Sequence, residues 1–87
     1  MPDPEREWQD LVRAEADIVA GEERLSRQEA LVAELQRDGH DTKAAKVLLE
    51  TLRRTLDEWR THRAQIIRHV QTAQERSAKE QERSAEK

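Results

Sequence analysis

The chain has 87 residues, of which 40% are charged and 34% are hydrophobic, and its formal net charge at pH 7 is −3. It contains no Cys, which excludes a disulfide scaffold, a zinc–thiolate site and thiol catalysis. The near balance of 16 basic and 19 acidic residues argues against nucleic acid as a partner, and no apolar run approaches the ~20 residues of a membrane span, so we expect no membrane partner.

The first predicted element is a helix over residues 4–38. Asp3 suits an N-cap, Pro4 suits the first helical position, and Glu5 and Glu7 place negative charge at the positive end of the helix dipole. Apolar residues then recur every seven positions, which is typical of a coiled-coil seam. The seam residues that we assign to this helix are Leu11, Ile18, Gly21, Leu25, Val32 and Leu35.

A turn is predicted at residues 39–41. Gly39 suits the left-handed conformation just past a helix end, and Asp41 suits the N-cap of the next helix, with Thr42 as the alternative. Two helices joined by about three residues fold back on each other as an antiparallel hairpin. We expect His40 to cover the helix end beside Leu35; a functional role on the exposed turn is the alternative.

The second helix is predicted over residues 42–73, and its seam positions alternate by four and three. They are Leu49, Leu52, Leu56, Trp59, Arg63, Ile66 and Val70. We interpret Arg63 as a residue that specifies register or oligomeric state, paired with Asp17 or Glu22 across the hairpin or with a second subunit. In the predicted register Gly21 lies opposite Trp59 and leaves room for the indole; a tolerated surface glycine is the alternative.

Residues 74–87 repeat a polar heptad that has no apolar residue larger than Ala. We predict a charged, solvated tail that is helical or frayed; a tail that binds a partner or nucleic acid is the alternative, and the balanced charges argue against nucleic acid.

A single hairpin has one seam, and further apolar residues lie beside or outside it. The proposed dimer or partner face consists of Trp8, Val12, Val19, Leu31, Leu48 and Ile67. Each side chain left exposed forfeits roughly 1.5–3 kcal/mol that full burial would contribute. We therefore predict an all-α fold in which two helical hairpins pair as a homodimeric four-helix bundle. A different protein partner would satisfy the same physics.

Catalytic and metal-binding patterns are weak. The sequence contains no Gly-rich phosphate loop and no Ser-His-Asp order that suits a pocket, so we predict no enzymatic activity and no cofactor. His62 and His69 share a helix face with Glu58, but the Glu-x-x-His spacing of di-metal bundles is absent. Polar residues that flank the seam are the favoured interpretation, and a metal-responsive bundle is a weak alternative.

The turn region carries the most specific pattern in the chain. Residues 28–49 read Q-x-x-L-V-x-x-L-x-x-x-G-H-D-T-x-x-A-x-x-L-L. This pattern resembles a group of small uncharacterised bacterial helical proteins that share the G-H-D-T turn, and the resemblance covers residues 18–63. It implies a bacterial, cytoplasmic setting and no activity. The N-terminus has no basic head or apolar stretch typical of a signal peptide, which also favours the cytoplasm.

These patterns together favour a non-enzymatic protein-interaction or oligomerisation module. The alternative from another class is a small regulator or inhibitor that docks on an enzyme or signalling protein through its exposed apolar stripe.

Overall fold

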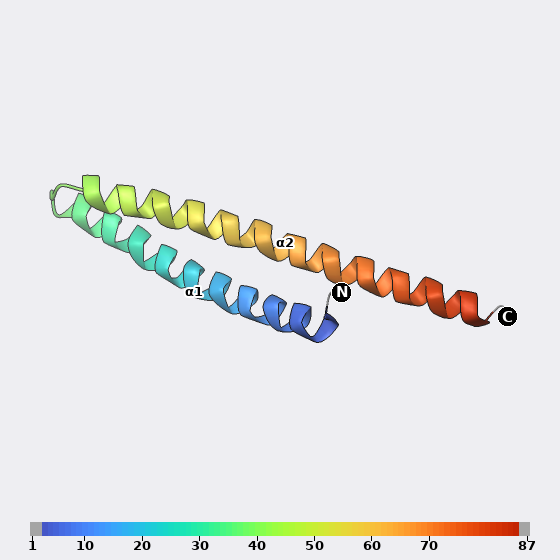
Figure 1. Ribbon diagram of the computed structural model, residues 1–87. Helices are drawn as coiled ribbons and strands as arrows, with labels where there is room; N and C mark the ends of the chain where they lie inside the picture. The colour runs from blue at the N-terminus through green and yellow to red at the C-terminus, as the bar shows by residue number, and fades with distance from the viewer. Residues whose placement is uncertain (1–2, 86–87) are drawn as a thin grey trace.

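The computed structural model describes residues 3–85 and consists of two antiparallel helices (Figure 1). Helix α1 spans Pro4–Arg37 and helix α2 spans Lys43–Ala85. The two pack side by side in a rod with extents of 75 × 19 × 15 Å. The prediction of an all-α helical hairpin is confirmed.

Helix α2 is the longer of the two, with 43 residues against 34 in α1. Figure 1 shows its C-terminal end projecting past the first turn of α1. Residues 74–85, which we predicted to be a helical or frayed tail, are helical and continue α2 through Ala85 without a break at residue 73. The polar heptads of this segment consist largely of strong helix formers, which is sufficient to extend a helix that is already nucleated.

Helix α1 begins with a side-chain cap. The carboxylate of Asp3 accepts a hydrogen bond from the Glu5 N–H at 3.1 Å, and its carbonyl accepts the first helical bond from the Glu7 N–H at 3.0 Å. Pro4 occupies the first helical position, where a missing N–H costs nothing because that group would have no helical partner.

Helix α1 ends in a Schellman motif. Asp38 is the C-cap and Gly39 follows with a φ of +75°. The Gly39 N–H donates to the Gln36 carbonyl at 3.2 Å, and the His40 N–H donates to the Leu35 carbonyl at 2.9 Å. These two bonds satisfy carbonyls that the helix end leaves free. The left-handed backbone at Gly39 would cost a residue with a Cβ roughly 1–2 kcal/mol.

Asp41 and Thr42 share the cap of α2. The Asp41 carboxylate accepts a hydrogen bond from the Lys43 N–H at 2.9 Å, and the Thr42 carbonyl accepts the first helical bond from the Lys46 N–H at 2.9 Å. Asp41 therefore supplies the capping carboxylate and Thr42 supplies the capping backbone carbonyl. Helix α2 starts one residue later than expected.

The core is a thin seam between the helices. Every residue that we assigned to the seam is buried or half-buried. Among the described residues the buried hydrophobic side chains are Ala14, Ile18, Val32, Leu49 and Leu56. A core of this size is small for 87 residues, because a two-helix layer covers only one side of each helix.

Gly21 lies where side chains of α2 pack closely against the α1 backbone. A Cβ placed on it would lie 3.2 Å from Leu56 Cδ1 and 3.2 Å from Trp59 Cζ3. Both distances are shorter than the 3.5–4.0 Å at which carbon atoms attract most strongly. The lack of a side chain at this position therefore lets the indole pack directly against the α1 backbone.

Gln28 forms a hydrogen bond between the two helices near the turn. Its side chain is buried, and its Nε2 donates to the Ala45 carbonyl at 2.9 Å. A hydrogen bond from a side chain to a backbone carbonyl across the seam helps to fix the register of one helix against the other.

Candidate interaction surfaces

Five of the six residues assigned to the dimer or partner face are exposed. Trp8, Val12 and Val19 have 60%, 58% and 56% of their surface accessible, and Leu31 and Leu48 are also exposed. Ile67 differs, because it is half-buried at the edge of the seam.

Two ion pairs between the helices mark one flank of the hairpin. The Arg63 Nε donates to the Glu15 carboxylate at 3.3 Å, and Arg60 lies 4.0 Å from the Glu22 carboxylate. Glu22 directly follows Gly21 of the seam, and Arg60 directly follows Trp59. Residues that directly follow a seam residue therefore lie on this flank in both helices, and we call it the ion-pair flank.

Val19 directly follows the buried Ile18, so it lies on the ion-pair flank. Val12 lies one heptad before Val19, and Trp8 lies one turn before Val12, so both share that flank. Ile67 directly follows the half-buried Ile66 of α2 and borders the same flank. We call Trp8, Val12, Val19 and Ile67 the open-end patch, since they lie away from the turn.

Leu31 and Leu48 lie on the opposite flank. Leu31 directly precedes the buried Val32, and Leu48 directly precedes the buried Leu49. Successive helical residues are rotated by about 100°, so a residue before the seam and a residue after it point to opposite sides. The single apolar stripe that we expected is therefore wrong, and the side chains form two patches. We call Leu31 and Leu48 the turn-end patch.

The partner of Arg63 also differs from the expectation. Arg63 pairs with Glu15, whereas Glu22 pairs with Arg60. Asp17 directly precedes Ile18, so it lies on the far flank and out of reach of Arg63. Both partners in each pair are 43–54% exposed, and such pairs contribute only about 0–1 kcal/mol.

The histidines lie at the surface. His40, His62 and His69 are all exposed. Within residues 3–85, no group of three His, Asp or Glu side chains is arranged to hold a metal ion.

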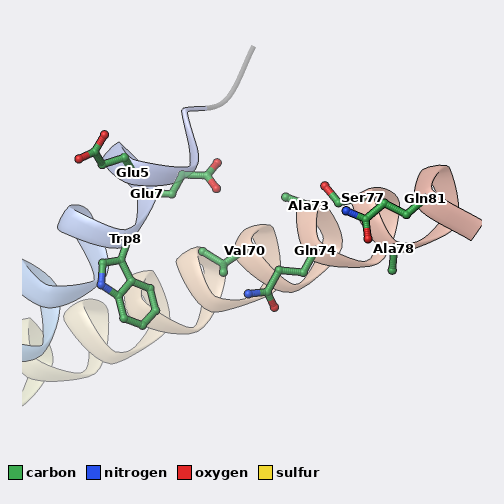
Figure 2. A pocket seen from close by; sticks show the side chains of 9 residues that line it. All are labelled: Glu5, Glu7, Trp8, Val70, Ala73, Gln74, Ser77, Ala78 and Gln81. Carbon is green, nitrogen blue, oxygen red and sulfur yellow. The ribbon is translucent and has the colours of Figure 1, made fainter.

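A groove of about 560 Å³ opens where α2 projects past α1. It is lined by Trp8 from α1 and by residues of α2 that include Val70, Ala73, Gln74 and Ala78. In Figure 2 the Trp8 indole extends from α1 toward the stretch of α2 that carries Val70 and Gln74. Sequence reasoning missed this groove, because it gave the residues after 73 no role in packing.

No family model, curated protein or solved structure matches the chain. The resemblance of the G-H-D-T turn therefore stays a prediction. Over the described residues, neither helix has a stretch that is both long and apolar enough to cross a membrane.

Proposed function

We propose that the chain is a non-enzymatic protein-interaction module that works as a homodimer of helical hairpins. The observation that carries this proposal is the open-end patch, in which a tryptophan and two valines share one flank and are each more than half exposed. The resemblance of the turn supports a bacterial cytoplasmic setting.

The energetics favour association through this patch. Full burial of one large apolar side chain contributes roughly 1.5–3 kcal/mol. Burying the exposed parts of Trp8, Val12 and Val19 would therefore contribute roughly 3–5 kcal/mol for each protomer. A second layer of helices would also bury more apolar surface than the thin seam of one hairpin can bury alone.

Sedimentation equilibrium across protein concentrations tests the proposal. We expect about twice the chain mass of 10.2 kDa at micromolar concentration. Helix content and melting temperature should rise with concentration, because association is linked to folding. A well-folded monomer whose melting temperature is independent of concentration would contradict the homodimer.

A second candidate function follows from the turn-end patch. Leu31 and Leu48 are exposed on the flank that a dimer through the open-end patch does not cover. This arrangement supports a regulator that docks on another protein while it remains dimeric. Crosslinking in the native cell should then yield a partner that is lost when both leucines are changed to Glu and retained when Val47, which is exposed outside this patch, is changed to Glu.

A further inference from the structure

Helix α2 has an end that no other part of the described chain covers. The groove residues place Trp8 beside Ala73 and Gln74, and α2 continues from there to Ala85. We call residues 74–85 the overhang, and at 1.5 Å per residue it is about 18 Å long. Every residue of the overhang is exposed.

One face of the overhang carries no charge. It consists of Gln74, Ala78, Gln81 and Ala85, which are spaced by four, three and four residues. Arg76 and Arg83 lie on the opposite face. A helix with small uncharged side chains at this spacing can approach another helix closely, and large side chains on the facing surface then fill the space.

The open-end patch matches the overhang in length and spacing. From Trp8 to Val19 is also a stretch of about 18 Å. Val12 and Val19 are seven residues apart, and so are Ala78 and Ala85. A parallel alignment with Ala78 beside Val12 therefore brings Ala85 beside Val19, so that a small residue meets a large one at both positions.

We propose that the overhang of one copy lies along the open-end patch of a second copy, and that the exchange is reciprocal about a two-fold axis near Trp8. This inference rests on the proposed homodimer and assigns its interface. In each half, the partner's overhang lies along the ion-pair flank, from Trp8 toward Val19 of α1. Three helices then enclose Val12, Val19 and Ile67 from opposite sides.

The contact area fits a small interface. The overlap runs from Val19 to the end of the overhang, which is about 36 Å along the rod. Each half of the overlap is covered by one helix of about 11 Å diameter, so the covered face is roughly 400 Å² for each protomer. The total of roughly 800 Å² lies below the range of about 1,200–2,000 Å² for stable interfaces and is typical of a weak, reversible dimer. Because the two-fold axis satisfies both overhangs, the assembly closes at two copies.

A disulfide test reads this arrangement directly, because the chain has no native Cys. Val12→Cys and Ala78→Cys are introduced together. Within one protomer Val12 lies four residues from Trp8 toward the turn, and Ala78 lies about five residues from the level of Trp8 toward the open end. At 1.5 Å per residue the two positions are therefore about 13 Å apart along the axis. A disulfide needs Cα atoms within about 7 Å, so the bond can form only between copies.

Under mild oxidation we expect the double variant to become mostly covalent dimer. The matched control combines Val12→Cys with Arg76→Cys, which lies on the far face of the overhang, and we expect it to crosslink at least tenfold more slowly. Equal crosslinking rates in the two variants would overturn the proposed alignment.

The dimer dissociation constant provides a second readout that does not depend on oxidation. Ala78→Gln combined with Ala85→Gln should raise it at least tenfold, whereas Arg76→Gln combined with Arg83→Gln should leave it within about twofold. If the wild type is a dimer and the alanine variant is equally tight, the overhang assignment fails and the homodimer stands. A monomeric wild type would overturn both.

Discussion

Gly21→Leu is the substitution that most sharply tests the packing of the hairpin. A Cβ at this position already meets Leu56 and Trp59 at 3.2 Å, and Leu56 is only 2% exposed. Three further carbon atoms would force the helices apart. Overpacking of this kind costs about 1–3 kcal/mol, partly offset by the ~1 kcal/mol gained when a helical glycine is replaced.

Urea unfolding followed by circular dichroism at fixed protein concentration gives the free energy of unfolding. The cost of overpacking less the gain in helix propensity leaves a net loss of up to about 2 kcal/mol for Gly21→Leu. Ala20→Leu is the matched control, because Ala20 is exposed on the same helix, and it should change stability by less than ~0.5 kcal/mol. Adding Trp59→Ala to Gly21→Leu should cost less than the sum of the two single effects, since removal of the indole makes room. A Gly21→Leu protein that is more stable than the wild type by the ~1 kcal/mol of helix propensity would refute the close approach at this position.

Three further substitutions probe the turn and the seam by the same unfolding assay. Gly39→Val should lose about 1–2 kcal/mol, because Gly39 has a φ of +75°, whereas Gly39→Asn should lose much less; equal losses would contradict the left-handed turn. Asp41→Ala should lose about 0.5–2 kcal/mol with its bond to the Lys43 N–H, and no loss would show that the Thr42 backbone cap suffices. Leu56→Ala should lose about 2–5 kcal/mol as a fully buried residue, and the exposed Val47→Ala should lose almost nothing.

Heptad spacing was sufficient to predict the hairpin. Regular apolar positions in both helices, with one Gly-containing turn between them, leave few alternatives to antiparallel pairing. The same spacing put Gly21 opposite Trp59. This register is favourable because a residue without a side chain and the largest side chain are complementary at one level of the seam.

The division of the exposed residues into two patches was harder to obtain from the sequence. Val19 and Leu31 both fall outside the seam. The fact that a residue lies outside the seam does not by itself say on which flank of the helix it lies. Their order relative to the neighbouring seam residues does carry that signal, since one follows Ile18 and the other precedes Val32. The partner of Arg63 depended on the same distinction between flanks.

The overhang shows a different limit. Residues 74–85 have no large apolar side chain, so hydrophobic periodicity carries no signal there. Their helical state depends on intrinsic propensity and on continuation from the preceding part of α2. The uncharged face of small residues can be recognised as a possible contact surface only once the structure places this helix beside Trp8.

The central claim is that the open-end patch holds two copies together, and sedimentation equilibrium of a patch variant tests it most directly. Val12 and Val19 are exposed in the hairpin, so changing both to Glu should preserve the helices while it places unpaired charges in the dimer interface. The matched control changes Leu31 and Leu48 to Glu on the opposite flank. The account predicts about 20 kDa for the wild type and the control, and the single-chain mass of 10.2 kDa for the patch variant. A patch variant that remains as dimeric as the wild type would contradict it.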